Sequence, residues 1–275
     1  MAGTLFVVAT PIGHLEDISA RALRVLGEAA VVAAEDTRRT GNLLRHFGIP
    51  TRILSLHQHN ERSRAPELVT RLRRGESVAM VSDAGTPGIS DPGAELVRLA
   101  REQGFRVEAV PGPSAVAAAM SLSGTSHPYF AFLGFPPVRS KDRKFWLSRL
   151  DRLRKDVTIV FFEAPHRIRK TLEALIYIEC PIMVFREMTK WHEETLSGTP
   201  CEVLKQLTSI QGEFTIVIPA MEVIENEDVA VSDELLTIEV GQLIENLGCS
   251  RREAARTVGE RYGLSTKRVY DATKG

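Results

Sequence analysis

Polar side chains and small residues gather in short loops that each follow an apolar, strand-like run of the sequence. The loops are TPIGHLED (10–17), EDTRRTG (35–41), SLHQHNE (55–61), SDAGTPGISDPG (82–93) and VPGPSA (110–115). Glycine and proline hold such loops in rigid shapes that leave backbone N–H and C=O groups free to face a ligand. Carboxylates and histidines supply groups that transfer protons. The pattern predicts a ligand-binding site with acid–base chemistry.

The candidates for a proton-accepting base in these loops are Asp36, His57, Glu61 and Asp83. Asp36 equally suits the N-cap of a helix that begins in TRRTGNLL, and Asp83 equally suits a brace for backbone N–H groups of its own loop. Only His57 ordinarily titrates near neutral pH, with His59 as its alternative. The residue types alone do not choose among them.

The end of the longest loop is interpreted differently. Asp91 stands directly before Pro92 and a helical pattern, which is typical of an N-cap followed by proline at the first helical position. We therefore exclude Asp91 from the predicted site.

Several common sites are missing from the sequence. There is no G-x-G-x-x-G after the first apolar run, no G-x-x-x-x-G-K-[ST] phosphate loop and no H-E-x-x-H zinc motif. The three cysteines are widely spaced, which favours free thiols over a disulfide framework or a C-x-x-C metal site. We expect no bound metal.

Apolar runs alternate with amphipathic helical patterns through the first half of the chain, which predicts an α/β fold with a parallel-rich sheet covered on both faces. In an open sheet of this kind the loops after the strands share one edge, where ligands bind. From residue 126 the chain has more strand-like runs per helix, which predicts a mixed second sheet. We expect an N-terminal α/β domain over 1–125 and a second α/β domain over 126–220.

The chain after residue 220 has two segments that differ in charge. Residues 221–232 are acidic and are interpreted as a linker. Residues 233–275 carry three short helical patterns that resemble a helix-turn-helix domain, and we expect a basic three-helix domain there because the segment from Gly248 onward has seven Arg or Lys against three acids. The chain as a whole has a formal net charge of 0, so contact with a polyanion requires local basic patches. No run approaches the roughly 18 apolar residues of a membrane span, and the first segment lacks signal-peptide features, so we expect a cytoplasmic protein without membrane contact.

The order of the loop and strand motifs along the chain resembles that of a known family. VVATPIGHLEDISARAL, AAEDTRRTGNLL, VAMVSDAGTPGISDPG, VPGPSA, FFEAPHR, REMTK and GEFTIVI occur in the order found in the ribosomal RNA small-subunit methyltransferase I family, within the tetrapyrrole-methylase-like (class III) S-adenosylmethionine methyltransferases. The resemblance covers about residues 4 to 219, and the basic tail is similar to that family's C-terminal domain. AEDTR together with SDAGTPGISDPG is the specific pair.

The resemblance implies 2′-O-methylation of a cytidine ribose in the decoding centre of 16S rRNA, with S-adenosylmethionine as donor and 16S rRNA or the small ribosomal subunit as partner. It also implies a homodimer with the cofactor in the cleft between two α/β domains. By position, it assigns the cofactor to Ile12, Thr86, Pro87, Ile89, Ser114, Ala115, Phe162, Glu187, Glu213 and Phe214.

Within this frame we expect the catalytic residues among Asp36, His57, Asp83 and Lys190. We expect the RNA phosphates to meet Arg38, Arg39, Arg143 and Arg167, the last two from the basic segments 139–144 and 166–170. Trp146, Trp191 and Tyr270 are candidates for stacking on bases, with the protein core as the competing location.

Two other functions remain open. One is a methylase of a tetrapyrrole or another small molecule, which the basic tail disfavours, as does Thr86 at a position where tetrapyrrole methylases tend to carry Asp. The other is a nucleic-acid-binding regulator whose helical tail binds while the α/β part senses a ligand.

Overall fold

Short, mostly apolar strands form the first sheet of this computed structural model, which describes residues 2–221, 232–262 and 264–273. The strands are β1 (Thr4–Val8), β2 (Val31–Ala34), β3 (Ile53–Ser55), β4 (Val78–Val81) and β5 (Arg106–Val110). They are all parallel, in the order β3-β2-β4-β1-β5. Every residue of β2 and β4 is buried, as expected of parallel strands covered on both sides.

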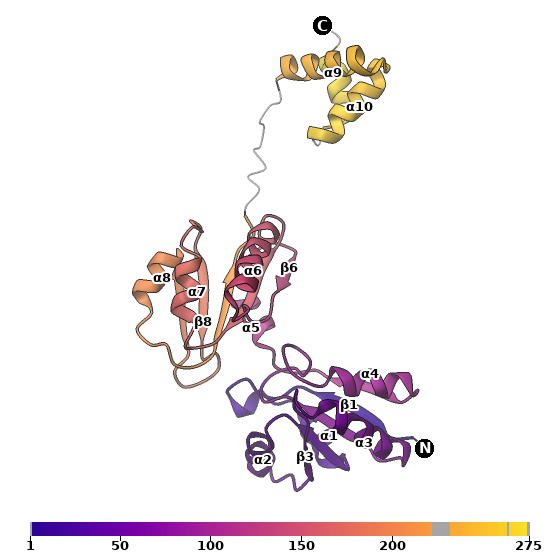
Figure 1. Ribbon diagram of the computed structural model, residues 1–275, viewed down its shortest axis with the longest axis vertical. Coiled ribbons are helices and arrows are strands. Elements are labelled where there is room, and N and C mark those ends of the chain that lie inside the picture. The colour runs from indigo at the N-terminus through magenta and orange to yellow at the C-terminus, as the bar shows by residue number, and fades with distance from the viewer. Residues whose placement is uncertain (1, 222–231, 263, 274–275) are drawn as a thin grey trace. The chain divides into compact units, whose positions relative to one another are not determined.

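Helices cover both faces of this sheet (Figure 1). They are α1 (Ala20–Glu28), α2 (Thr37–His46), α3 (Glu61–Arg73) and α4 (Ala94–Glu102), with the short 3-10 helix η1 (Leu15–Asp17) before α1. On one face Leu26 of α1 and Leu44 of α2 join a buried apolar cluster with the strands. On the other face Leu68 of α3 and Leu96 of α4 do the same.

The strand order creates a switch point between β1 and β4. The chain leaves β1 toward β2 on one side and leaves β4 toward β5 on the other, so the loops after these two neighbouring strands diverge. Ligands bind at such crevices in open α/β sheets. The loops 10–17 and 82–93 are therefore placed side by side at the carboxyl edge of the sheet.

The second sheet is mixed. It consists of β6 (Phe130–Phe132), β7 (Thr158–Glu163), β8 (Ile182–Arg186), β9 (Glu194–Gly198) and β10 (Phe214–Ile218) in the order β6-β7-β10-β8-β9. Only β6 and β7 pair in parallel among these described strands. The predicted fold class, with a parallel-rich first sheet and a mixed second sheet, is confirmed.

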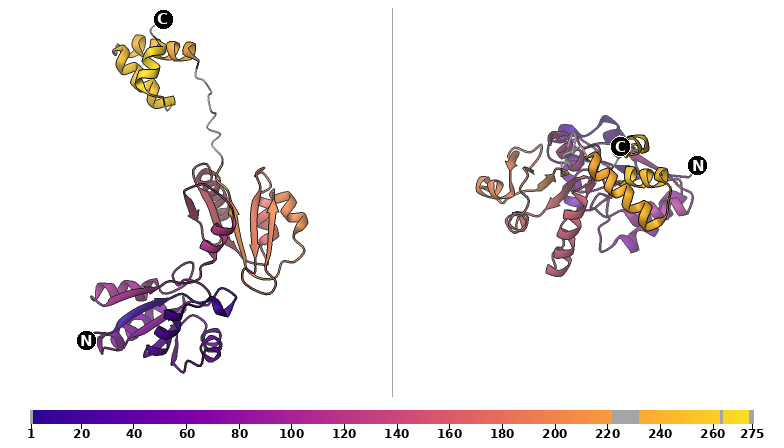
Figure 2. Two further views of the ribbon diagram at one scale, coloured as in Figure 1. Left: turned by 180° about the vertical axis from the view of Figure 1, so that it is seen from behind. Right: turned by 90° about the horizontal axis from the view of Figure 1, so that it is seen from above.

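Helices also cover the second sheet (Figure 2). The helices α6 (Ser140–Leu153), α7 (Ile168–Ala174) and α8 (Pro200–Gln206) contribute Leu150, Leu172 and Val203 to a cluster on one face. On the other face α5 (Ala115–Leu122) packs through Val116 and Ala119 against Val160 and Val217. By its packing α5 thus lies with the second sheet, although it precedes our proposed boundary at residue 125.

The structure divides into two compact units, Met1–Met221 and Glu222–Gly275, which we describe separately. The second unit contains α9 (Asp233–Leu247), α10 (Arg251–Tyr262) and α11 (Thr266–Ala272) around its own core, which includes Leu236, Ala255 and Val269. Ser232, Ser250 and Ser265 each accept a backbone hydrogen bond at a helix start. Most of the predicted acidic linker, residues 222–231, lies outside the described residues.

No helix in the described parts of the chain is long and apolar enough to cross a membrane.

Candidate active site

The loops at the edge of the first sheet face the second sheet across a cleft of about 410 Å³. Most of the residues predicted to bind the cofactor line it: Ile12, Thr86, Ile89, Ser114, Ala115, Phe162, Glu213 and Phe214. Pro87 is buried inside its loop and Glu187 stands behind Glu213, so neither lines this cleft. We call this cavity the first cleft.

Glycines and backbone hydrogen bonds fix the loop 82–93 on one wall of the first cleft. Gly85 and Gly88 have φ of 78° and 81°, a conformation that favours glycine, and Ser90 is held at φ 68°. Gly85 exchanges two backbone hydrogen bonds with Thr10, at 2.9 and 3.0 Å. The Thr86 hydroxyl donates to the carbonyl of Pro113 at 3.1 Å. Loops from three strands are thereby joined into one rigid wall.

Three carboxylates, those of Glu35, Asp83 and Asp91, stand together on this wall. Burial, followed by the charge of Glu35, raises the pKa of Asp91 from 3.8 to about 6. Burial and the nearby Asp83 raise the pKa of Glu35 as well. The site therefore holds a concentration of negative charge that is costly without a cationic partner.

Asp91 does not cap the next helix, so our exclusion of this residue requires correction. The helix α4 begins at Ala94 with Gly93 as its N-cap residue, at φ 120°. Its first N–H groups are satisfied by Glu61, whose Oε1 accepts from Gly93 N at 3.0 Å and from Glu95 N at 2.7 Å. A carboxylate from α3 takes the role predicted for Asp91, and Asp91 is left to line the first cleft. Glu61 in turn lines no described cleft.

A hydrogen bond joins the loops that carry Asp36 and Asp83. Asp36 Oδ1 accepts from the backbone nitrogens of Arg38 and Arg39, so Asp36 is the N-cap of α2, and these bonds hold its pKa below the usual range. The backbone N–H of Asp36 donates to Asp83 Oδ1 at 2.8 Å. Asp83 Oδ2 lies 3.7 Å from Nη1 of Arg39. Asp83 thus braces the loop after β2 with one oxygen and faces a cation with the other.

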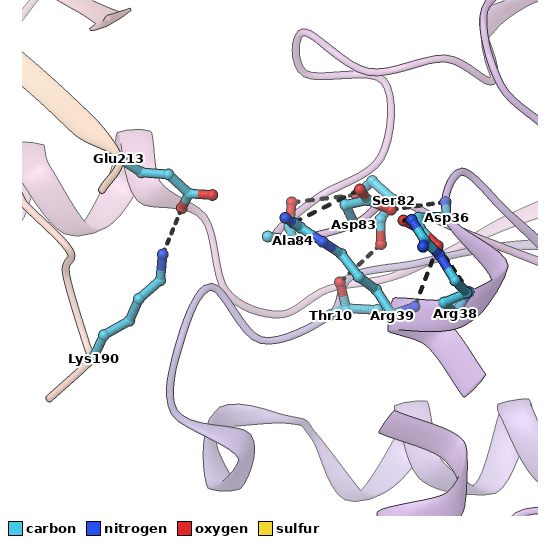
Figure 3. Close-up of polar contacts among 9 residues, drawn as sticks. All are labelled: Thr10, Asp36, Arg38, Arg39, Ser82, Asp83, Ala84, Lys190 and Glu213. Carbon is cyan, nitrogen blue, oxygen red and sulfur yellow. Dashed lines mark hydrogen bonds and ion pairs between the residues drawn. The ribbon is translucent and has the colours of Figure 1, made fainter. Parts of the chain in front are cut away.

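Lys190 is held by the second sheet. Its Nζ donates to Glu187 Oε1 at 2.8 Å and to Glu213 Oε2 at 2.9 Å. Burial lowers the pKa of Lys190, but the two carboxylates outweigh burial and raise it, so the ammonium stays charged. Figure 3 shows Lys190 and Glu213 on one side of the view and the group formed by Thr10, Asp83 and Arg39 on the other.

Unusual backbone keeps Lys190 in place. Glu187 and Thr189 have φ of 53° and 64°, which is uncommon for residues other than glycine. Gly13 approaches this turn so closely that a Cβ atom would lie 2.5 Å from Lys190 Cγ and 2.9 Å from the carbonyl oxygen of Met188. The strain and the close approach join the loop after β1 to the turn after β8.

His57 lines neither described cleft, and its Nδ1 accepts a hydrogen bond from the backbone of His59 at 3.2 Å. Although burial raises the pKa of Glu35, His57 lies close enough to the first cleft for its charge to oppose that rise. His57 therefore stands beside the cleft rather than in its lining.

Arg143 and Arg167 also need correction, because Arg143 is buried and Arg167 largely so, and both are engaged by protein partners rather than presented to a polyanion. Arg167 Nη2 pairs with Glu163 Oε1 at 2.8 Å, and Arg143 Nη2 lies 4.0 Å from Glu163 Oε2. Thr171 hydrogen-bonds both Arg143 and Glu163. This network holds the fully buried Glu163 carboxylate at the floor of the first cleft, so we no longer propose these arginines as phosphate contacts. By contrast, the side chain of Arg38 is 90% exposed, and Trp146 is buried whereas Trp191 is exposed.

The sequence interpretation missed Glu35 and Glu163 at the first cleft and excluded Asp91. Glu35 directly precedes Asp36 after the end of a strand, and that position was a usable signal. Glu163 pairs with Arg167, four residues later, but its burial also depends on Arg143, twenty residues earlier, which nothing in the local sequence indicates. No cluster of metal-ligating side chains occurs among the described residues.

A second cleft of about 420 Å³ adjoins the first. The two share Ile12, Arg39, Asp83, Ala84 and Glu213. The second cleft extends from this shared wall along α2 and past Lys190.

Comparison with known proteins decides the family. Residues 4–203 match the family described as Tetrapyrrole (Corrin/Porphyrin) Methylases. The chain is 39% identical over 279 residues to the ribosomal RNA small subunit methyltransferase I of Haemophilus influenzae, covering 98% of this chain and 96% of that protein. It is 47% identical over 223 residues to the protein of the same name in Xylella fastidiosa, covering 78% and 81%. The chain belongs to the ribosomal RNA small subunit methyltransferase I family.

Membership in this family makes the chain a methyltransferase, and its fold agrees with more distant members of the class. The crystal structure of uroporphyrin-III-C-methyltransferase from Thermus thermophilus matches with a TM-score of 0.57 at 19% identity, over 86% of this chain and 97% of that one. At this identity the likeness concerns the fold alone, because one fold serves many substrates.

Proposed function

We propose that this methyltransferase transfers a methyl group from S-adenosylmethionine to the ribose 2′-hydroxyl of a cytidine in the decoding centre of 16S rRNA. It acts in the cytoplasm, on 16S rRNA or the small ribosomal subunit, as a homodimer. The printed names of its relatives support the ribosomal RNA substrate. The ribose position, the nucleotide and the dimer rest on the resemblance of the motifs.

The composition of the first cleft is the observation that carries the donor assignment. S-adenosylmethionine combines a sulfonium and an ammonium with an adenine ring. Carboxylates of Glu35, Asp83 and Asp91 suit the cationic part, while Phe162 and Phe214 offer apolar surface to a ring. The residues present therefore fit this donor.

When bound, S-adenosylmethionine would supply the methyl group: the acceptor oxygen would attack the methyl carbon in line and form an O–C bond as the C–S bond breaks, and the C–S electron pair would pass to sulfur, which leaves as S-adenosylhomocysteine. The first contribution of the protein is to position the donor and the acceptor, because the reacting atoms must be aligned and water kept out. The rigid wall formed by Thr10, Gly85 and Thr86 supplies this alignment.

The hydroxyl proton must leave the acceptor, and Asp83 is placed to receive it. Its Oδ1 is fixed by the backbone of Asp36, and its Oδ2 stands at the wall that both clefts share. Lys190 is already protonated, so it acts as a cation near the developing negative charge rather than as a base. Arg38 and Arg39, exposed on α2, contact the RNA phosphates.

The test is transfer of labelled methyl from S-adenosylmethionine to under-methylated small subunits or bare 16S rRNA. We expect transfer by the wild-type protein and none by Thr86→Trp, whose ring fills the first cleft. Loss of donor binding with retention of RNA binding in this variant supports the assignment. Absence of transfer from the wild-type protein to either substrate would overturn it.

A further inference from the structure

The second cleft has a different chemical character from the first. Carboxylates dominate the first cleft, where Glu35 and Asp91 add to the shared Asp83 and Glu213. None of the lining residues peculiar to the second cleft is acidic. They include the hydrogen-bonding side chains of Thr40, Asn42 and His46 and the cation Lys190. A cationic ligand thus favours the first cleft, and a neutral or anionic ligand with several hydrogen-bonding edges fits the second.

The shared wall sets the relation between the two ligands. Ile12, Ala84 and Asp83 line both clefts, so molecules in the two cavities meet at these residues. Group transfer requires such contact, because donor and acceptor atoms must approach within about 3–3.5 Å. The carboxylate proposed to receive the proton stands at the same place.

From this arrangement we infer that the second cleft receives the acceptor nucleotide, with its base toward Asn42 and His46 on α2 and its ribose toward Asp83. The inference rests on the proposed function and specifies where its substrate lies. An amide can hydrogen-bond the edge of an unstacked base, and a histidine ring can stack on its face. Both side chains are exposed on α2, so a nucleotide that leaves an RNA strand reaches them without rearrangement of the core.

The exposed surface next to Lys190 is suited to a single-stranded nucleic acid. Trp191 directly follows Lys190 and is 95% exposed, although burial of a tryptophan ring is ordinarily favourable. Trp191 lines neither cleft, but Lys190 beside it lines the second cleft. An exposed aromatic ring next to a lining residue offers a stacking platform for a neighbouring base, which is how single-stranded nucleic acids are commonly held. A small-molecule acceptor enclosed by the cleft would have no use for it.

Paired obstruction of the two clefts tests the inference. Asn42→Trp fills the second cleft from an exposed position of α2, and Thr86→Trp fills the first. Thr37→Trp is the matched control, because Thr37 is exposed on the same helix and lines neither cleft. Binding of S-adenosylhomocysteine is measured by calorimetry. Binding of cytidine 5′-monophosphate at millimolar concentration is then followed by NMR of the full chain saturated with S-adenosylhomocysteine.

For the wild-type protein we expect the mononucleotide to shift resonances of α2 and of the 188–191 turn. Asn42→Trp should abolish these shifts and lower methyl transfer by at least about 100-fold, while its affinity for S-adenosylhomocysteine stays within about twofold of wild type. Thr37→Trp should retain both kinds of binding. Shifts that are absent, lie elsewhere, or survive in Asn42→Trp would overturn the inference. Unchanged S-adenosylhomocysteine binding by Thr86→Trp would instead overturn the donor assignment, so the two failures are distinguishable.

Discussion

Glu61 at the start of α3 accepts a hydrogen bond from the backbone nitrogen of Gly93 at 3.0 Å and so caps the neighbouring helix α4. The same oxygen accepts from Glu95 N at 2.7 Å. Because Gly93 ends the loop that carries Thr86 and Ile89, this one carboxylate fixes the far end of the first-cleft wall to a helix that lines no part of it.

Removal of this cap should weaken both stability and donor binding. For Glu61→Ala we expect a loss of about 1 kcal/mol in the free energy of unfolding, the usual effect of losing a helix cap. The affinity for S-adenosylmethionine should also fall, because the loop loses its anchor. Urea unfolding and calorimetry provide the two measurements. Glu67→Ala removes an exposed carboxylate of the same helix and should change little; equal effects of both substitutions would contradict the capping role.

Substitution of Asp83 separates its two roles. Asp83→Asn keeps an oxygen for the Asp36 backbone N–H but cannot take up a proton. We expect donor affinity to stay within about threefold of wild type and kcat to fall by about 10²–10⁴-fold, the usual contribution of a general base. Single-turnover kinetics would show this. A kcat within a few fold of wild type would mean that Asp83 only braces the loop.

Donor affinity should depend on pH through Asp91. Its pKa is raised from 3.8 to about 6, so at pH 5 only about one-tenth of this group is ionised. A cationic donor favours the ionised form, so affinity should rise by about tenfold from pH 5 to pH 7. Calorimetry across this range measures the effect. Asp91→Asn should flatten the profile, whereas Glu95→Gln, a change to an exposed carboxylate paired with Arg98, should leave it as in wild type.

The same shift predicts the direction of a stability change. Between pH 3.8 and about 6 the folded protein holds a proton on Asp91 that the unfolded chain has lost, so this group makes the protein less stable as pH rises through that window. Without ligand, Asp91→Asn should therefore be more stable than wild type at pH 7, with the difference shrinking toward pH 4. A difference that grows toward low pH would show that Asp91 has a favourable partner in the free protein.

Gly13 and Gly27 allow the same substitution to be compared at a crowded position and at an open one. Gly13→Ala would place a methyl group 2.9 Å from the Met188 carbonyl and closer still to Lys190, so the two loops must separate. We expect a lower melting temperature and a large loss of transfer. Gly27→Ala in α1 meets nothing within 4 Å and should stabilise the protein by about 0.5–1 kcal/mol. Thermal unfolding and transfer assays compare them; normal transfer by Gly13→Ala would contradict a need for the close approach.

The strands and helices could be predicted because local patterns determine them. Runs such as VVAA and VAMV are apolar throughout, and four helices, α1, α9, α10 and α11, begin directly after a serine that caps them, so local sequence and tertiary position agree. The edge of the sheet where ligands bind follows from strand direction alone, which is why Thr86 and Ser114 could be placed at the first cleft from their loops.

Other assignments depend on contacts between distant residues, which no local pattern contains. A basic helix such as 140–153 reads as a solvated surface, yet Arg143 turns inward because Glu163 is buried and needs a partner. Asp91 looks like a cap until Glu61, thirty residues earlier, is found in that role. Both errors concern charged side chains whose position is set by a partner rather than by their own element.

Methyl transfer to a ribose of 16S rRNA is tested most directly by locating the transferred methyl group in the RNA. Small subunits from cells that lack this modification are incubated with the protein and isotopically labelled S-adenosylmethionine, and the 16S rRNA is digested to nucleosides and mapped fragments for mass spectrometry. We expect the label on the 2′-oxygen of a single cytidine in the decoding centre. A label on a base or on another nucleotide, or no label in the RNA, would contradict the account.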